Sequence, residues 1–332
     1  SVNGSIVAST VCPRLGLSSD ETENVKWLVG PDWLSDESKI PTKEQVLAEV
    51  TRIKNQEIYK RQRTGQLIDG DATTDGIYPS IGDQLDLLWH DIDNGKLGDT
   101  NSKIIIEECL FGEEASFFFA VDQTDIKFLG SAKDYKRIGE GNKGLNTGGM
   151  GCISPSPKEN RKITFKIIRD IIKPTVKTMN DLGYPFRGFL YAGVIFTKKG
   201  IYLIEYNVRL GDPECQAILG RLKTDFIDIC LAIKNDDLSN LKIERSKKKV
   251  ACVVLASKGY PEKYSKNMEI FGINDFKENT NITVYHAGTK KDNSGKIVTN
   301  GGRVLNIIGK ANTLKVSLES AYSVCKKIFW KG

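Results

Sequence analysis

Residues 204–216, IEYNVRLGDPECQ, place polar and charged groups at the tip of a strand-like run. Side chains alternate between the two faces of a strand, so Leu203, Glu205 and Asn207 are expected on one face and Ile204 on the other. A carboxylate and an amide oxygen one pleat apart suit a hard divalent cation such as Mg²⁺, which takes few protein oxygens and completes its shell with water and phosphate oxygens. A polar strand end capped by a turn is the other interpretation.

A second candidate site is the loop RIGEGNKGLNTGGMG, which carries six glycines between residues 139 and 151. Backbone N–H groups of glycine can approach an anion without interference from Cβ, so such a loop can cradle phosphate or carboxylate. It matches neither a Walker loop nor a G-x-G-x-x-G turn, and a flexible surface loop is an alternative interpretation. Asp134, Lys136 and Arg137 lie beside the loop and supply fixed charge, which favours a binding site.

Two acidic pairs, Glu107-Glu108 and Glu113-Glu114, follow a buried strand in the stretch IIIEECLFGEEAS. Carboxylates at a strand exit can accept hydrogen bonds from an adenine amino group or from ribose hydroxyls. Charges on a solvated turn are the alternative.

Strands and helices expected from hydrophobic periodicity position these residues. The strand-like runs are KIIIEE, ASFFFAV, GFLYAGVIFT, IYLIEYN, KKVACVVLAS and ITVYHAG, and helices are expected near residues 159–182, 214–234 and 310–328. Residues 1–98 differ from the rest, with a helix-start signal at Pro41-Thr42 and an apolar helical stripe as far as about Arg63. The run RSKKK, beginning at Arg245, is expected to be a solvated linker.

The composition is that of a globular protein and excludes several classes of function. The longest apolar runs fall far short of the ~20 residues of a membrane span, and no signal-peptide pattern opens the sequence, so a cytoplasmic protein is expected. Seven scattered cysteines without a C-x-x-C pair indicate neither a disulfide framework nor a zinc site. The net charge of +6 comes mostly from dispersed lysines, so no nucleic-acid partner and no membrane partner are expected.

The three candidate segments, in this order, closely resemble one family, the phosphoribosylamine–glycine ligases, or glycinamide ribonucleotide synthetases, which are ATP-grasp enzymes of purine biosynthesis. The matching stretches are EECLFGEEASFFFAVD, KDYKRIGEGNKGLNTGGMGCISPSP, GFLYAGVIF, IEYNVRLGDPECQ, ASKGYPEKY, and HAGTK followed by IVTNGGRVL. The resemblance implies an α+β fold class. Residues 99–244 would form the ATP-grasp large lobe, an antiparallel sheet with flanking helices, and residues 245–332 a small strand-rich C-terminal domain, behind a helical N-terminal segment.

The function implied by the resemblance is the ATP-dependent joining of glycine to 5-phosphoribosylamine through glycyl phosphate, giving glycinamide ribonucleotide, ADP and phosphate. The implied cofactors are ATP and Mg²⁺ or Mn²⁺, and the implied partners are the two small-molecule substrates. Glu205 and Asn207 would hold the metal. Glu107 and the backbone of Cys109 and Leu110 would face adenine, and Glu114 would face the ribose.

The catalytic and substrate-binding residues are also implied by the resemblance. Arg209 and Asp212 would border the glycine and γ-phosphate region, with Lys136 and Arg137 as the other catalytic residues. The site for phosphoribosylamine would be lined by Asp134, Asn146, Thr147, Gly148, Gly149, Met150 and Gly151.

Residues 1–98 depart from the family pattern and distantly resemble short tail-associated proteins of bacteriophages. The family begins with a nucleotide-binding-like domain and a small lobe whose lysines cover the ATP phosphates, and neither is recognised in this sequence. The sequence therefore predicts an incomplete enzyme, with a separate N-terminal half as a candidate partner. The alternative is an inactive ATP- and magnesium-binding remnant fused to a phage structural or interaction segment.

Overall fold

The computed structural model describes residues 110–273 and 280–331. The expected strand KIIIEE and the expected N-terminal helix lie outside these ranges. Within them, no helix is long and apolar enough to span a membrane.

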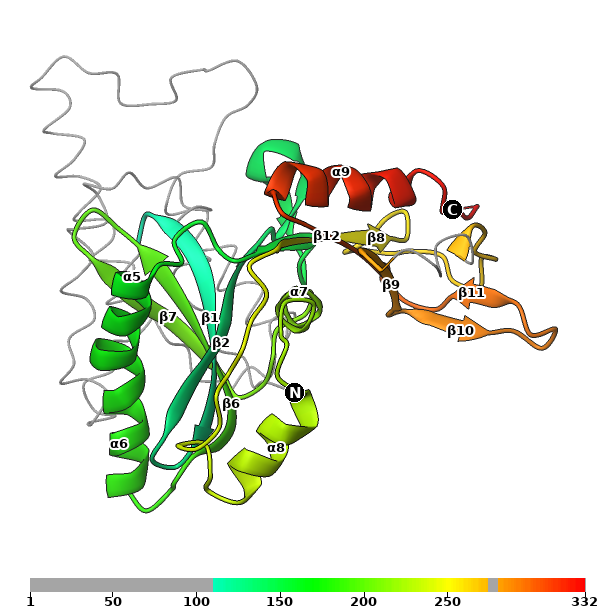
Figure 1. Cartoon of the computed structure of the whole chain (residues 1–332). Coiled ribbons are helices and arrows are strands. Elements are labelled where there is room, and N and C mark those ends of the chain that lie inside the picture. The colour runs from blue at the N-terminus through cyan, green and yellow to red at the C-terminus, as the bar shows by residue number, and fades with distance from the viewer. Residues whose placement is uncertain (1–109, 274–279, 332) are drawn as a thin grey trace, which may run out of the picture. The chain divides into compact units, whose positions relative to one another are not determined.

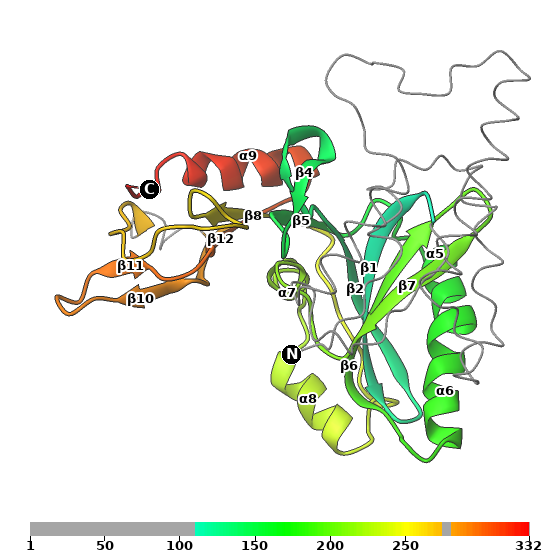
Figure 2. The same cartoon turned by 180° about the vertical axis from the view of Figure 1, so that it is seen from behind.

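Eight strands form one sheet in the order β7-β6-β1-β2-β5-β8-β12-β9 (Figures 1 and 2). Each neighbouring pair is antiparallel. The strands are β1 (Glu113–Asp122), β2 (Ile126–Asp134), β5 (Gly151–Ser154), β6 (Arg187–Phe196), β7 (Ile201–Asn207), β8 (Lys249–Ala256), β9 (Ile282–His286) and β12 (Arg303–Ala311). The large antiparallel sheet predicted from the sequence is therefore confirmed.

Two short hairpins project from this framework. The first joins β3 (Arg137–Gly139) to β4 (Lys143–Asn146) through the 3-10 turn η4 (Glu140–Asn142). The second pairs β10 (Thr289–Lys291) with β11 (Ile297–Thr299). The first hairpin carries the beginning of the glycine-rich loop.

Helices cover both faces of the sheet around β1 (Figures 1 and 2). The helical run α5 (Arg161–Ile167), η5 (Ile168–Ile172, a π-helical segment) and α6 (Lys173–Asp181) packs on the face that carries Phe117 and Phe119. The helix α8 (Phe226–Lys234) packs on the opposite face with Phe118. Because β1 is buried on both faces, its sequence is a continuous apolar run rather than an alternating one.

The segment expected as one helix over residues 214–234 forms two helices, α7 (Glu214–Leu219) and α8. Helix α7 ends at Gly220, and α8 begins after Asp225, whose carboxylate accepts the N–H of Ile227 at 2.7 Å. An Asp before a helix satisfies a free N–H group of the first turn and fixes the helix start.

The C-terminal residues extend the same sheet. Strand β8 pairs with β5, and Cys152 lies directly opposite Cys252 in that pairing. Gly151 is required there, because a Cβ at this position would lie 2.6 Å from the carbonyl oxygen of Cys252. Helix α9 (Leu314–Cys325) begins at the cap Thr313 and packs with β12 over a third cluster of apolar side chains.

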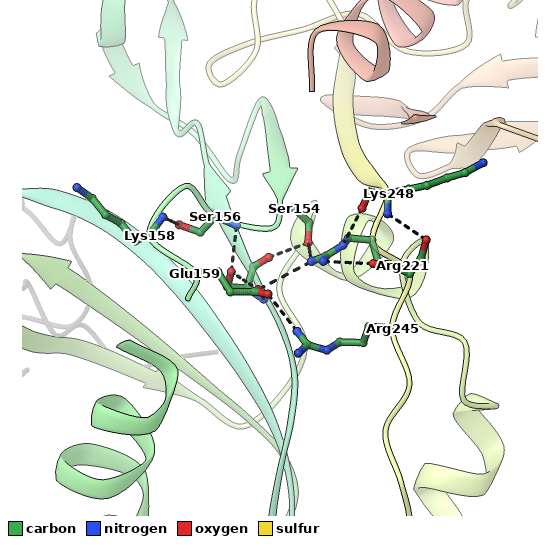
Figure 3. Close-up of polar contacts among 9 residues, drawn as sticks. Ser154, Ser156, Lys158, Glu159, Arg221, Arg245 and Lys248 are labelled. Carbon is green, nitrogen blue, oxygen red and sulfur yellow. Dashed lines mark hydrogen bonds and ion pairs between the residues drawn. The ribbon is translucent and has the colours of Figure 1, made fainter. Parts of the chain in front are cut away.

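A buried polar network ties the segment before β8 to β2 and β5 (Figure 3). The Glu159 carboxylate accepts the N–H and the hydroxyl of Ser131 at 3.1 and 2.7 Å and lies 3.2 Å from Nη1 of Arg245. Arg221, only 6% exposed, donates to Ser154 Oγ at 3.2 Å and lies 3.8 Å from Glu159. The run RSKKK is thus anchored by its first residue instead of lying free in solvent.

Candidate functional site

A hollow opens where β7, β6, β1 and β2 lie side by side. Four of the predicted residues line it: Glu114 at the start of β1, Asp134 at the end of β2, Lys136 just after β2, and Glu205 on β7. The remaining lining residues are Ala115, Ser116, Tyr191, Gly193, Val194 and Ile204. Neighbouring strands therefore bring together residues that the sequence separates widely.

Glu205 and Asn207 point the same way, as their spacing predicts. Asn207 Nδ2 donates to Glu205 Oε1 at 3.2 Å. The pairing of β7 with β6 shifts in register around Ile204, so the strict alternation expected from Leu203 onward is interrupted by a bulge before Glu205. The bulge bends the strand next to the pair and does not separate the two side chains.

This pair offers two hard oxygen donors, the second carboxylate oxygen of Glu205 and the amide oxygen of Asn207. Among the described residues no group of three or more His, Cys, Asp or Glu side chains is placed to hold a metal. A site with few protein ligands is the pattern that Mg²⁺ favours when phosphate and water complete its shell. The donor set therefore fits Mg²⁺.

Lys136 supplies positive charge to the hollow, and it is the basic residue among those that line it. Its Nζ lies 3.8 Å from Glu114 Oε2, and both side chains are about half exposed, at 42% and 59%. An exposed pair at this distance is held weakly, so Lys136 can turn toward an anionic ligand at little cost.

Asp134, at the end of β2, lies in an environment that disfavours its charged form. Its Oδ1 atom is buried and has no hydrogen-bond partner among the described residues. Burial raises the pKa of Asp134 to about 7, and the nearby charge of Glu214 adds to the rise, while Lys136 and Arg303 oppose it. A carboxylate whose pKa lies near neutrality can exchange a proton with a ligand.

Glu214 is a second buried carboxylate beside the hollow, and sequence reasoning assigned it no role. It is 3% exposed at the start of α7, and it accepts the hydroxyl of Ser116 at 3.3 Å. A Cβ on Gly211 would collide with its carboxylate. Burial raises the pKa of Glu214 as well. The sequence signal that could have indicated Glu214 is its position directly after Asp212-Pro213, in the stretch IEYNVRLGDPECQ.

The loop of residues 146–151 folds tightly over Asp134. Thr147 N and Oγ1 both donate to the carbonyl oxygen of Lys136, at 2.8 and 2.7 Å. Gly149 adopts a positive φ of 110°, and a Cβ there would lie 2.9 Å from Asp134 Oδ1 and 2.5 Å from Pro213. The glycine is thus required by close packing against two segments.

The backbone N–H groups of this loop already have acceptors within the protein. Gly148 N donates to the hydroxyl of Tyr260 at 3.0 Å, Gly149 N to Thr147 Oγ1 at 3.0 Å, and Met150 N to the carbonyl oxygen of Tyr135 at 2.8 Å. In this conformation, therefore, residues 147–150 do not offer an open anion cradle. Asn146 ends β4 and is exposed, and Gly151 begins β5.

Two residues of the C-terminal part, Tyr260 and Arg303, complete the wall around this loop. Arg303 Nη1 donates to the carbonyl oxygens of Gly148 and Asp212 at 2.6 and 2.7 Å. Both residues lie in stretches that match the family, GYPEKY and GGRVL, but nothing in their local sequence predicts these contacts.

The other predicted residues lie farther from the hollow or outside the described ranges. Arg209 is exposed and donates to the carbonyl oxygen of Leu210. Arg137 Nη1 donates to the carbonyl oxygen of Gly144 at 3.0 Å and so braces the β3–β4 hairpin. Leu110 is the first described residue, and Glu107 and Cys109 are not among the described residues.

Comparison with known proteins identifies the family. A model described as "Phosphoribosylglycinamide synthetase, ATP-grasp (A) domain" matches residues 82–215, and one for the C domain of the same synthetase matches residues 250–332. A phosphoribosylamine–glycine ligase from Vigna unguiculata is 41% identical over 241 residues, which cover 72% of this chain and 78% of the relative. The chain belongs to the phosphoribosylamine–glycine ligase family.

Other members of the ligase family agree with this assignment. The ligase of Caldanaerobacter subterraneus is 45% identical over 249 residues, 75% of this chain. The crystal structure of the Thermotoga maritima ligase aligns with a TM-score of 0.67 at 32% identity, covering 77% of this chain and 63% of that one. The predicted family and ATP-grasp fold are confirmed.

The match covers only part of the relatives and reaches into the N-terminal segment. The chain spans 58% of the length of the Caldanaerobacter ligase. The A-domain match begins at residue 82, which lies within the segment that the sequence pattern set apart as residues 1–98. The comparisons give no support to a resemblance between that segment and phage tail-associated proteins.

Proposed function

We propose that this chain binds ATP with Mg²⁺ and joins glycine to 5-phosphoribosylamine, producing glycinamide ribonucleotide, ADP and phosphate. The observation that carries the proposal is the convergence of Glu114, Asp134, Lys136 and Glu205 on one hollow, with Asn207 beside Glu205. Membership of the ligase family supplies the identity of the substrates.

Glu205 and Asn207 are the residues that hold the metal in this proposal. When bound, Mg²⁺ (or Mn²⁺) neutralises part of the charge on the ATP phosphates. Glu114 receives the ribose hydroxyls from the other side of the hollow. Glu107 and the backbone of Cys109 and Leu110 complete the nucleotide site.

The chemistry has two stages, activation of the glycine carboxylate as glycyl phosphate and attack by the amine of 5-phosphoribosylamine. The contribution of a protein to phosphoryl transfer is mainly position and charge. Lys136, which is only weakly paired with Glu114, supplies positive charge for the acyl phosphate. The proposal also assigns Arg209, Arg137 and Asp212 to the glycine and phosphate region, although Arg209 and Arg137 do not line the hollow. Asp134 with the loop of residues 146–151 receives the amine substrate in this proposal.

The test is ADP release by the full chain, with and without the added N-terminal half of a related ligase, in the presence of ATP, Mg²⁺, glycine and 5-phosphoribosylamine. Release should depend on both glycine and the amine, and omission of either should abolish it. Release that is independent of glycine would contradict the proposed ligation.

A matched pair of variants tests the metal ligands separately from turnover. Glu205→Gln keeps the size of the side chain and removes its charge, so Mg²⁺-dependent nucleotide binding should weaken by roughly 1–3 kcal/mol, the scale of one charge-assisted contact. Glu319→Gln makes the same change on the exposed surface of α9 and should leave binding unchanged. Equal losses in both variants, measured by calorimetry, would remove Glu205 from the metal site.

The remaining parts of the sequence-based interpretation stay predictions. A cytoplasmic location is expected, and the expected partners are the two small-molecule substrates, with a separate N-terminal half as a further candidate. The alternative, an inactive nucleotide-binding remnant fused to a phage segment, is not favoured by the comparisons.

A further inference from the structure

We propose that Asp134 is the proton acceptor for the amine of 5-phosphoribosylamine. The inference rests on the proposed ligase function and assigns one catalytic role within it. As the amine nitrogen bonds to the acyl carbon of glycyl phosphate, the bond from that carbon to the phosphate oxygen breaks. The phosphate leaves with the electron pair, and the proton lost by nitrogen passes to the Asp134 carboxylate.

Among the described residues, no donor reaches the Oδ1 atom of Asp134. Asp134 lines the hollow, yet its Oδ1 is buried without a partner among the described residues. A buried acceptor left unsatisfied costs about 1–3 kcal/mol, so such atoms are normally paired. An amine N–H is a donor of the required kind, and its binding would satisfy this oxygen.

The polar groups next to Asp134 do not donate a hydrogen bond to its Oδ1 atom. Ser116 Oγ lies within hydrogen-bond distance of the Tyr191 hydroxyl at 3.0 Å and of Glu214 Oε1 at 3.3 Å. The loop above Asp134 approaches with the bare Cα of Gly149, and Pro213 packs against the same glycine. Proline has no N–H, so this side presents no competing donor from Pro213.

The other acids near the hollow are less suited to accept the proton. Glu205 belongs to the metal pair, and Glu114 is 59% exposed and faces Lys136. Glu214 is 3% exposed and covered by Gly211, so it acts on Asp134 only through its charge. Asp134 therefore combines a place in the lining of the hollow with a buried, unsatisfied oxygen.

The charged groups that face Asp134 come from three elements. Glu214 on α7 disfavours its ionised form, whereas Lys136 after β2 and Arg303 on β12 favour it. Burial outweighs the two cations and raises the pKa of Asp134 to about 7. A general base works best when its pKa lies near the working pH, because it is then ionised before the step and still basic enough to take a proton.

The experiment measures glycine-dependent ADP formation by the full chain and by Asp134→Asn over a pH series. In the wild type, kcat should rise with pH through an inflection near 7 and then level off. Loss of a general base lowers turnover by about 10²–10⁴-fold, and the residual rate of Asp134→Asn should lack that inflection. The KM for glycine and the affinity for ATP should stay within about twofold of the wild type, since the step concerns the second substrate.

Asp181→Asn is the matched control, because it makes the same change at an exposed residue at the end of α6. It should reproduce the wild-type rate and pH profile. ATP affinity and thermal unfolding of Asp134→Asn report whether that variant is folded.

Three other outcomes would contradict either the role of Asp134 or the proposed function. A raised KM for glycine with kcat retained would mean that Asp134 binds the glycine ammonium group and accepts no proton from the second amine. If the wild type turns over and Asp134→Asn keeps both the wild-type rate and the inflection near pH 7, Asp134 is not the proton acceptor, but the proposed function stands. A wild type without glycine-dependent turnover, even when the N-terminal half of a related ligase is added, would overturn the proposed function and this inference with it.

Discussion

Arg303 holds Asp212 at two points. Its Nη1 donates to the carbonyl oxygen of Asp212 at 2.7 Å, and its Nη2 lies 2.9 Å from the carboxylate oxygen Oδ2. The same Nη1 also reaches the carbonyl oxygen of Gly148. One side chain of β12 therefore fixes both segments that border the candidate substrate site.

Arg303→Lys tests this clamp. Lysine keeps the charge but loses the planar fork that serves several acceptors at once. Loss of charge-assisted contacts to the two segments should lower the free energy of unfolding by about 1–3 kcal/mol and reduce glycine-dependent turnover. Arg187→Lys provides the control, because its pair with Asp236 is exposed on both sides and should cost less than about 1 kcal/mol. Similar losses in the two variants, measured by urea unfolding, would argue against a special role for Arg303.

Gly149→Ala should impair the site more than Gly141→Ala, although both glycines have positive φ. At Gly141 a Cβ meets no atom within 4 Å, so the cost is that of the backbone conformation, about 1–2 kcal/mol. At Gly149 the new Cβ would also press on Pro213 and on Asp134 Oδ1. Gly149→Ala should therefore lose more stability and most of the turnover, which thermal unfolding and the ADP assay measure. Equal stability of the two variants would show that the loop moves aside freely.

The stability of the fold should fall as pH rises from about 4 to about 7, through the contribution of Asp134. Burial raises the pKa of this carboxyl from its ordinary value of 3.8 to about 7. The unfolded chain therefore releases the proton at lower pH than the folded chain, and the folded state loses stability across this window. The loss is complete once the pH exceeds the folded-state pKa.

Asp134→Asn removes this dependence, so its stability relative to the wild type should increase between about pH 4 and pH 7, by on the order of a few kcal/mol. Urea unfolding at several pH values measures the difference. Asp181→Asn should show no comparable change over the window. A constant difference between Asp134→Asn and the wild type would contradict the raised pKa.

Arg221→Met should destabilise the protein by about 3–5 kcal/mol, because it leaves Glu159 in a buried network with one of its cations removed. Arg221 also donates to Ser154 Oγ and to the carbonyl oxygen of Lys248, so β5 and the segment before β8 lose a shared contact. Lys177→Met breaks an exposed pair with Asp181 on α6 and should cost less than about 1 kcal/mol. A loss for Arg221→Met no larger than that of Lys177→Met would mean that the network adds little.

Local sequence patterns predicted several strands whose residues are apolar and β-branched or aromatic, but they missed β12, whose run RVLNIIGKA is of the same kind. The run IYLIEYN coincides with β7, and the expected β1 and β6 agree with the observed strands within a few residues. Strand β2 was missed, because its centre carries Gly130 and Ser131 instead of large apolar side chains. The expected helix over residues 310–328 begins only at Leu314, after the cap Thr313, since residues 310 and 311 still belong to β12.

Local sequence patterns likewise predict only part of the candidate site. Glu205 and Asn207 are two residues apart, so strand geometry alone predicts that they point the same way. The contact of Arg303 with Asp212 spans 91 positions, and that of Ser116 with Glu214 spans 98. Contacts of this kind depend on the order of the strands in the sheet, which no local pattern encodes.

The pairing of β5 with β8 has a consequence for how the chain is made. During synthesis, β5 emerges from the ribosome well before β8, and until β8 follows, one side of β5 has no hydrogen-bonding partner. A nascent chain in this state presents an open strand edge with the apolar side chain of Ile153 beside it, the kind of edge that promotes association between chains. Completion of the C-terminal strands closes that edge, so a chain that stops before Lys249 is expected to aggregate while the full-length chain remains dispersed.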